Sequence, residues 1–341
     1  MENYELILCA SMNTLAALPD LLVSKFRCRP IPVMDPEKRR LIRKTFVELF
    51  VVLYYLMKLR PGDKLFISCV LPTTLWLLEI SNRLLRRTDI HVVLHRETES
   101  LIDKSAQSFQ RYGYWAVKWI RSRKSQSRIK LVVLDDFQRD KLVQEFPGKL
   151  NVSNVSVIHH PVSPILLDGN NAPRTPTVGF IGYRTQFKGF EHFSRMALEH
   201  SSAIFLAIGG GKVENINAGT VEYLNGKDAY LKEISKCWLA LFPYTSGYSC
   251  SLSAAALDAL SAGVYIVSLD QPFFRSLAMY FGPEIVTVCS SIDELSAELT
   301  SRLMSFKQED RATRLERLSK SKYSLADVQR SLEKLAFNII T

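Results

Sequence analysis

The segment from Val178 to Phe190 reads VGFIGYRTQFKGF and carries the pattern that decides the fold class. An apolar run ends at Gly182, and Arg184 and Lys188 follow before a helical stretch begins. A glycine at the carboxyl end of a strand lets the backbone approach a ligand, and two cations a turn apart can neutralise a diphosphate. The alternative is that both basic side chains simply solvate a loop.

A second segment, from Phe242 to Ser268, reads FPYTSGYSCSLSAAALDALSAGVYIVS. Two apolar strands enclose a Ser/Gly-rich turn, which opens an Ala-rich helix that Gly263 closes. The first turn of a helix offers N–H groups and partial positive charge to a phosphate. Asp258, two turns into this helix, either points to solvent or meets a hydroxyl-bearing ligand. The candidate binding residues of the turn are Tyr244, Ser246, Gly247, Tyr248, Ser249 and Ser251.

Short apolar runs alternate with amphipathic helical stretches along the whole chain, which predicts parallel sheets covered by helices. A loop rich in Pro, Asn, Gly and Asp runs from Pro161 to Thr177 and predicts a domain boundary. We therefore expect an α/β protein of two Rossmann-like domains, 1–165 and 166–341, with a cleft between them and a last helix able to pack back on the first domain. The expected strands are Glu5–Ala10, Lys64–Cys69, His91–His95, Lys130–Leu134, Val155–Ile158, Thr177–Ile181, Ala203–Ile208, Val221–Tyr223, Leu239–Phe242, Tyr265–Ser268 and Ile285–Val288.

The formal charge of +10 is distributed unevenly along the 341 residues. Residues 1–150 hold 26 basic and 16 acidic residues, whereas residues 151–341 hold 18 of each. A basic first domain indicates an anionic neighbour, such as lipid headgroups or nucleic acid. Six cysteines without a CxxC pair are typical of buried, reduced thiols in the cytosol, and the N-terminus lacks the pattern of a signal peptide.

The stretch from Phe109 to Arg121 combines aromatic and basic residues at helical spacing, which suits an interfacial helix on anionic lipid. The alternative is an ordinary surface helix packed by its aromatic side chains. The apolar helix that ends near Leu59 is expected in the core. Because no apolar run reaches about 18 residues, any membrane contact is expected to be peripheral.

Candidate catalytic residues of the first domain lie in HVVLHRETES, where His95, Glu97 and Glu99 follow the end of an expected strand. Ligands of open α/β sheets collect at that edge, so a general base is well placed there. The alternative is a surface loop with a satisfied histidine. His159 and His160 precede the linker and are expected to be structural, since no third metal ligand lies near them in sequence.

The segments that start at Val178 and Phe242 together resemble the donor-binding half of GT-B glycosyltransferases, especially the retaining family 4 enzymes. Those enzymes carry a "G-R … K-G" loop and an acidic "E-x-x-x-x-x-x-x-E-A-x-x-x-G" helix. Arg184 and Lys188 match the loop, although Tyr183 separates the arginine from the preceding glycine, and Asp258 matches the second acid of the helix. The first acid would fall at Cys250, which departs from the family pattern.

The resemblance implies that Arg184 and Lys188 hold the diphosphate of a donor and that Asp258 binds its ribose hydroxyls. Gly182 and Tyr183 complete the expected donor site, and His95 and Glu97 join the two cations as catalytic candidates. The implied substrate is a UDP- or GDP-sugar, with no tightly bound cofactor and no required metal.

The expected function is a hexosyltransferase that moves a sugar from a nucleotide-sugar donor to a lipid-linked saccharide or similar acceptor in cell-surface polysaccharide synthesis. We expect it in the cytoplasm, bound peripherally to the anionic inner face of the cell membrane, and the resemblance favours a retaining outcome over an inverting one. One alternative is a sugar-nucleotide epimerase of the same fold. Another is a basic nucleic-acid-binding protein, which would explain Arg111 to Lys130 but not the donor-type half, so nucleic acid is not the expected partner.

Overall fold

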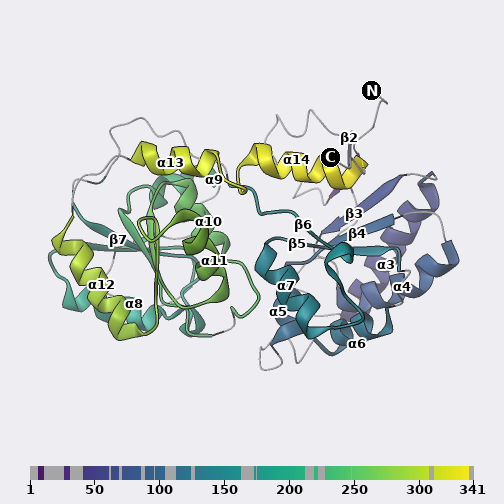
Figure 1. Ribbon diagram of the computed structural model, residues 1–341, viewed down its shortest axis with the longest axis horizontal. Coiled ribbons are helices and arrows are strands. Elements are labelled where there is room, and N and C mark those ends of the chain that lie inside the picture. The colour runs from purple at the N-terminus through teal and green to yellow at the C-terminus, as the bar shows by residue number, and fades with distance from the viewer. Residues whose placement is uncertain are drawn as a thin grey trace. The chain divides into compact units, whose positions relative to one another are not determined.

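The structure is a computed structural model (Figure 1). It describes residues 7–10, 27–30, 41–60, 63–68, 71–85, 89–95, 97–103, 113–123, 127–162, 173, 175–211, 219–221, 227–246, 248–306 and 311–337. The chain divides into two compact units. Unit 1 comprises Met1–Val92 and Trp115–Ile129, and unit 2 comprises Val93–Tyr114 and Lys130–Thr341. The domain boundary expected between residues 165 and 166 stays a prediction.

Unit 1 contains two helices that pack against each other, α3 (Leu41–Lys58) and α4 (Pro72–Leu85). The one acidic residue of the apolar α3 helix, Glu48, faces α4. Its carboxylate accepts hydrogen bonds from the N–H of Leu71 and the hydroxyl of Thr74, both at 3.0 Å. An anionic group at the first turn of α4 is favourable, since it satisfies N–H groups that lack a partner within the helix. No helix in the described part of the chain is long and apolar enough to cross a bilayer.

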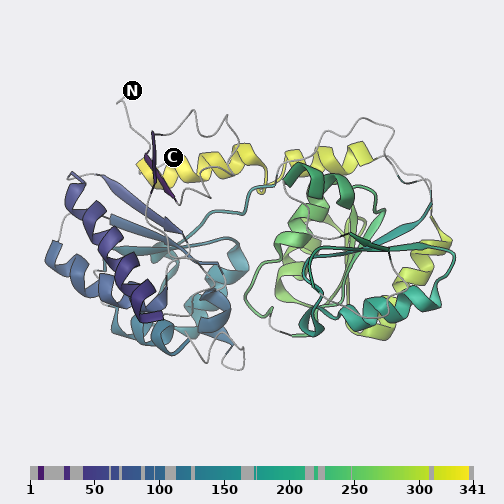
Figure 2. The ribbon, with the colours of Figure 1, turned by 180° about the vertical axis from the view of Figure 1, so that it is seen from behind.

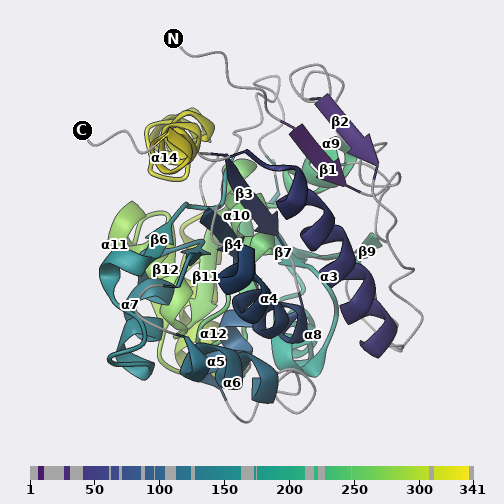
Figure 3. The same cartoon turned by 90° about the vertical axis from the view of Figure 1, so that its right-hand side faces the viewer.

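The strands of the N-terminal part form two sheets. β1 (Ile7–Ala10) and β2 (Arg27–Pro30) pair in parallel and lie side by side in Figure 3. A four-stranded sheet has the order β3-β4-β5-β6, formed by β3 (Lys64–Ser68), β4 (Asp89–Val93), β5 (Ile129–Val133) and β6 (Val155–Val157). Three helices accompany these strands: α5 (Glu97–Ile102), α6 (Tyr114–Ser122) and α7 (Asp136–Glu145).

The larger sheet lies in unit 2 and has the order β12-β11-β10-β7-β8-β9, with parallel neighbours throughout (Figure 2). Numbered from β7, this is the 3-2-1-4-5-6 order of a doubly wound sheet, whose direction of winding changes between β7 and β10. Its strands are β7 (Thr177–Ile181), β8 (Ile204–Ile208), β9 (Gly219–Val221), β10 (Leu239–Phe242), β11 (Tyr265–Leu269) and β12 (Val286–Cys289). The strands expected over this part of the sequence are confirmed to within one residue, apart from Val221–Tyr223, of which only Val221, the last residue of β9, is described.

Apolar cores lie on both faces of this sheet, which explains why its central strands β7 and β10 are buried at every position. One core includes Ile181 with side chains of α9 (Lys227–Ile234), α10 (Ala254–Ser261) and α11 (Pro272–Phe281). The other includes Phe180 with side chains of α8 (Phe190–Glu199) and α12 (Ile292–Met304). The expected α/β class with parallel sheets is therefore confirmed.

Two helices follow the sheet at the end of unit 2, α13 (Arg311–Ser319) and α14 (Leu325–Phe337). Arg314 of α13 donates to the carbonyl oxygen of Gly263 at 2.8 Å and lies over the Tyr265 ring. Val328 of α14 packs in one apolar cluster with Val132 and Ile158. The C-terminal helix thus packs onto residues at and beyond the ends of β5 and β6.

Candidate functional site

The switch point between β7 and β10 is the part of the larger sheet where a ligand site is expected, because the connections on either side diverge there and leave space. Val178 pairs with Leu239 and Gly179 with Ala240, so the two strands end side by side. The segments that follow them, 182–189 and 243–253, are the two segments that sequence analysis selects as ligand-binding. The topology therefore brings both to one edge of the sheet.

Glycines allow these loops to approach closely. Gly182 has φ +115°, and its N–H donates to the carbonyl oxygen of Ile208 at 2.8 Å. Gly189 has φ +67°, and a Cβ placed there would lie 1.9 Å from the carbonyl oxygen of Pro243. No other residue fits at this second position without moving the backbone.

Lys188 ends the 3₁₀ helix η3 (Gln186–Lys188) and is half-buried at this edge. Its Nζ lies 5.4 Å from the centroid of the Tyr244 ring. A Cβ placed on Gly182 would lie 2.8 Å from that Nζ and 3.7 Å from Cβ of Ala255, in the first turn of α10. A cation and the positive end of a helix thus both lie close to Gly182, an arrangement that repels cations and favours an anion.

Tyr244, over whose ring the Lys188 ammonium lies, is fixed by its own contacts. Its side chain is fully buried, its ring stacks on that of Tyr248 at 4.3 Å, and its hydroxyl lies 3.0 Å from Oγ of Ser253. Ser253 in turn caps α10, since its Oγ accepts from the N–H of Ala256. Burial raises the pKa of the Tyr244 phenol far above its usual value, so the ring stays neutral beneath Lys188.

The turn before α10 is held by a carboxylate from a distant part of the chain. Oε1 of Glu99 accepts from the N–H and the hydroxyl of Ser249, at 2.9 and 2.7 Å, and Oε2 accepts from the N–H of Cys250 at 2.7 Å. Glu99 is buried and lies on α5. The position where family 4 enzymes carry their first acid is therefore occupied by a cysteine whose backbone meets a carboxylate from elsewhere. Burial raises the pKa of the Cys250 thiol to about 12, and the nearby Glu99 adds to the effect.

The carbonyl groups of the same turn are also satisfied. The Lys141 ammonium donates to the carbonyl oxygen of Ser249 at 2.6 Å. The carbonyl oxygen of Cys250 accepts from Nε2 of Gln138 at 2.8 Å and lies 2.9 Å from Oγ1 of Thr98. Sequence analysis missed these contacts because it had no means of pairing residues more than a hundred positions apart.

The other turn residues differ in exposure. Ser246 is exposed, Tyr248 and Ser249 are half-buried, and Ser251 is buried. Gly247 lies outside the described residues. The N–H and the hydroxyl of Ser249 both donate to Glu99, so Ser249 helps to hold the turn in place. The donor-binding roles of all these residues stay predictions.

His95 and Glu97 lie together just after β4. Oε2 of Glu97 accepts from the N–H of His95 at 2.8 Å, and the hydroxyl of Thr98 lies 2.7 Å from the carbonyl oxygen of His95. Thr98 and Glu99 on the same helix reach Cys250, so the structure joins the candidate base cluster to the turn before α10. Catalytic roles for His95 and Glu97 stay predictions.

Arg184 lies in a different environment from Lys188. It is 7% exposed, and its guanidinium donates to the carbonyl oxygens of Gly209 and Gly211 at 2.8 and 2.9 Å. Its side chain thus holds the loop after β8, while the neighbouring Tyr183 is 60% exposed. Asp258 is half-buried in α10. Diphosphate binding by Arg184 and ribose binding by Asp258 stay predictions.

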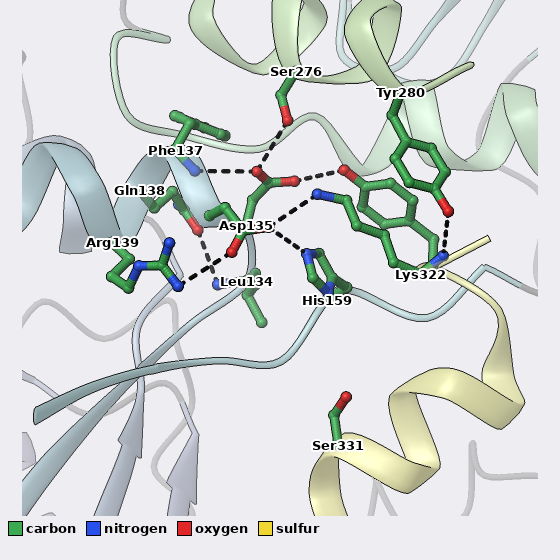
Figure 4. Close-up of polar contacts among 12 residues, drawn as sticks. Leu134, Asp135, Phe137, Gln138, Arg139, His159, Ser276, Tyr280, Lys322 and Ser331 are labelled. Atoms are coloured by element: carbon green, nitrogen blue, oxygen red, sulfur yellow. Dashed lines mark hydrogen bonds and ion pairs between the residues drawn. The ribbon is translucent and has the colours of Figure 1, made fainter. Parts of the chain in front are cut away.

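A second polar cluster surrounds the start of α7 (Figure 4). Asp135 is fully buried, accepts from the Tyr323 hydroxyl at 2.6 Å and from the Ser276 hydroxyl at 3.1 Å, and caps α7 through the N–H of Phe137. Sequence analysis missed this cluster, although an acid before the apolar start of a helix is an N-cap signal.

The adjacent Asp136 meets an imidazole and an ammonium group instead of hydroxyls. Its Oδ2 lies 3.2 Å from Nε2 of His159 and 3.0 Å from Nζ of Lys322. The hydrogen bond from His159, followed by the contacts with Lys322, holds the pKa of Asp136 well below its usual value. His159 contacts the Asp136 carboxylate here, and the described residues contain no cluster of metal-ligand side chains.

The fold is similar to several solved structures. Sucrose-phosphate synthase from Thermosynechococcus elongatus has a TM-score of 0.66 at 12% sequence identity, covering 92% of this chain and 83% of that one. WaaG, a glycosyltransferase involved in lipopolysaccharide biosynthesis, has a TM-score of 0.62 at 14% identity, covering 98% and 99%. HepE from Anabaena, in complex with UDP, has a TM-score of 0.61 at 13% identity, covering 85% and 82%.

No protein-family model matches the sequence, and no curated protein matches it significantly. The structural likeness is nevertheless consistent over most of the chain and among different glycosyltransferases. The chain therefore has the GT-B fold, as the sequence resemblance predicts. At this level of identity the comparisons establish the fold, and the activity has to be argued from the site.

Proposed function

We propose that this chain is a glycosyltransferase that takes a sugar from a nucleotide-sugar donor. The observation that carries the proposal is the pairing of Lys188 with the first turn of α10 at the switch point of the larger sheet. A nucleoside diphosphate is an anion of suitable size for this position. The structural neighbour HepE supports the ligand class, because it was solved with UDP and with UDP-glucose.

The same groups would assist the reaction. The bond between the anomeric carbon and the diphosphate oxygen breaks, and negative charge develops on the departing nucleoside diphosphate. Lys188 and the N–H groups of α10 are already in place to stabilise that charge, so little reorganisation is needed as it forms. The acceptor hydroxyl then bonds to the anomeric carbon and loses its proton.

We propose a retaining outcome, in which the departing phosphate takes the proton of the acceptor hydroxyl. This choice is supported by the resemblance to the retaining family 4 enzymes. In an inverting reaction, His95 or Glu97 would instead act as the general base. Measurement of the anomeric configuration of the product by NMR separates the two outcomes.

The proposed acceptor is a lipid-linked saccharide or a similar molecule, used in cell-surface polysaccharide synthesis at the cytoplasmic face of the membrane. Two observations support it. The excess of basic residues in the first part of the chain suits an anionic membrane surface. The structural neighbour WaaG is a glycosyltransferase involved in lipopolysaccharide biosynthesis, which supports a related acceptor.

Thermal unfolding with a set of nucleotides tests the donor class. We expect UDP or GDP, and the matching nucleotide-sugar, to raise Tm, since a ligand at 100 times its Kd adds about 2.7 kcal/mol to the stability of the folded state. The matched control is the corresponding nucleoside, which lacks the diphosphate and should raise Tm much less. Equal responses to nucleoside and nucleoside diphosphate, or no response to any nucleotide, would contradict the proposal.

A further inference from the structure

Helix α3 exposes four large apolar side chains along one face, which we call the α3 stripe: Phe46, Phe50, Tyr54 and Met57. Their exposed fractions are 62%, 72%, 39% and 69%. Spacings of four, four and three residues place them on one side of the helix. Val52 and Leu56, which face the other way, are buried. The helix therefore has one apolar face in the core and a second one on the surface.

Sequence analysis expects the helix ending near Leu59 in the core, and the structure differs, because α3 also exposes an apolar face. For the stretch from Phe109 to Arg121 the sequence leaves open an interfacial helix or an ordinary surface helix packed by its aromatic side chains. In the structure Trp119 is 1% exposed, so its ring belongs to the core, and residues 104–112 lie outside the described residues. A helix that is apolar on both sides gives no periodic signal to show which of its faces is covered.

Exposed apolar groups of this size on one helix face mark an interaction surface. The α3 stripe contains no acidic residue, since the one acid among residues 45–58, Glu48, caps α4. Lys58 ends the helix and is exposed, with its Nζ 4.6 Å from the Tyr54 ring. Aromatic and aliphatic side chains next to a cation are the combination that enters the boundary between lipid headgroups and acyl chains.

The charge of the unit that contains α3 points to the same partner. The two segments of unit 1 hold 19 basic and 9 acidic residues, a net charge of +10, whereas unit 2 holds 25 of each. Unit 1 therefore carries the whole net charge of the chain. A second copy of the chain would bring an equal positive charge to the contact, while a bilayer with anionic headgroups brings the opposite sign.

We infer that the α3 stripe docks unit 1 onto an anionic lipid bilayer. The inference deepens the membrane part of the proposed function and rests on it. Phe46, Phe50 and Met57 would insert at the headgroup boundary, and the basic residues of unit 1 would add long-range attraction that salt weakens. Donor binding at Lys188 is a separate property and needs no lipid.

Vesicle flotation tests the inference with two double variants of the full chain. Phe50→Gln/Met57→Gln removes the two most exposed members of the α3 stripe. Met279→Gln/Met304→Gln is the matched control, because these methionines are 89% and 84% exposed in the neutral unit 2. With phosphatidylglycerol in phosphatidylcholine vesicles, we expect the α3 variant to bind at least about tenfold more weakly than wild type and the control to bind like wild type.

Three results would overturn the inference. The first is equal flotation of wild type and the α3 variant, and the second is an equal loss of vesicle binding in both double variants. The third is that wild type binds no vesicles but self-associates in light scattering, and that the α3 variant no longer self-associates. If the double variant unfolds, Phe50→Gln alone serves in the same comparison. Nucleotide-dependent Tm shifts on the same samples separate the two proposals: a wild type that responds to UDP but does not float contradicts only the membrane inference.

Discussion

Arg184 and Lys188 stand on the same loop after β7, yet their surroundings are opposite. The Arg184 guanidinium is buried against the carbonyl oxygens of Gly209 and Gly211. The Lys188 ammonium lies at the edge of the sheet, near the Tyr244 ring and the first turn of α10. Both residues match the basic loop of the family pattern, so sequence alone treats them as equivalent.

The difference between them follows from their chemistry. A guanidinium has five N–H donors in a rigid plane and can satisfy several carbonyl oxygens at once, whereas an ammonium is a compact charge on a flexible stem. Arg184 is therefore suited to hold the loops of the sheet in place, and Lys188 is suited to meet a phosphate. The contacts that a charged side chain already makes are therefore the best guide to whether its role is structural or ligand-binding.

The largest effect is expected for Arg184→Met, which keeps the apolar stem but removes every donor. Buried carbonyl groups would lose their partners, so we expect the free energy of unfolding to fall by about 2 to 4 kcal/mol. Urea unfolding measures this loss. Arg195→Met is the control, because Arg195 is 56% exposed and makes surface contacts with Glu199 at 3.9 Å and His192 at 3.4 Å. Its effect should stay within about 0.5 kcal/mol.

If Arg184→Met kept nearly normal stability but lost nucleotide binding, the structural role assigned to Arg184 would be wrong. The guanidinium would then belong to the donor site, as the family resemblance implies, and its carbonyl contacts would be replaceable. Loss of stability with retained nucleotide binding would instead confirm the structural role.

Glu99 is an anion in the same situation as Arg184, because its charge is already bound by backbone groups of another segment. In Glu99→Gln one of the two carboxylate oxygens becomes an NH2 group, which would face the N–H of Ser249 or that of Cys250, so we expect the free energy of unfolding to fall by about 2 kcal/mol. Urea unfolding measures this loss, and nucleotide binding should weaken as the turn before α10 loosens. Glu97→Gln is the control, since Glu97 lies on the same helix and contacts only the N–H of His95 among the hydrogen bonds found here.

An unchanged stability of Glu99→Gln would show that the turn before α10 does not depend on this carboxylate. If nucleotide affinity fell while stability stayed constant, Glu99 would instead act directly at the donor site.

Much of the fold can be predicted from sequence because the larger sheet is covered on both faces. β10 is a continuous apolar run and β7 is apolar after Thr177, and the predicted bounds of both match the structure. β2 was not predicted: it reads RCRP, with two arginines and a proline, and has no strand pattern. Its place in the structure depends on pairing with β1, which a local pattern does not reveal.

The site was predictable to a smaller extent. The two loops proposed to bind the donor could be located, since glycines and turn residues signal them locally. The contact of Glu99 with Cys250 could not, because it joins residues 151 positions apart. The burial of Arg184 was equally hidden, since it depends on carbonyl groups of another loop.

Lys188→Gln should separate ligand binding from stability. Removal of a charge-assisted contact is expected to raise the Kd for UDP or GDP by roughly 10- to 100-fold, while the free energy of unfolding changes by less than about 1 kcal/mol. Isothermal titration calorimetry measures the affinity. Lys236→Gln is the control, because Lys236 pairs on the surface with Glu233 and should leave binding unchanged. Equal affinities of wild type and Lys188→Gln would remove the residue on which the proposed function depends.

The smallest effect concerns Asp135 and Asp136, a second pair of neighbours with opposite surroundings. Asp135 is buried among hydroxyl and N–H donors, whereas the side chain of Asp136 is 42% exposed and meets His159 and Lys322. These contacts lower the pKa of Asp136, so its contribution to stability is complete above the usual aspartate pKa near 4 and is lost as the pH falls below that value.

Asp136→Asn should therefore lower the free energy of unfolding at neutral pH, by at most about 1 kcal/mol because solvent screens a half-exposed pair, and by less in acid. Urea unfolding at several pH values measures the difference between the two proteins. A difference that stays constant from neutral pH to about pH 3 would mean that Asp136 acts through its shape and hydrogen bonds and not through its charge.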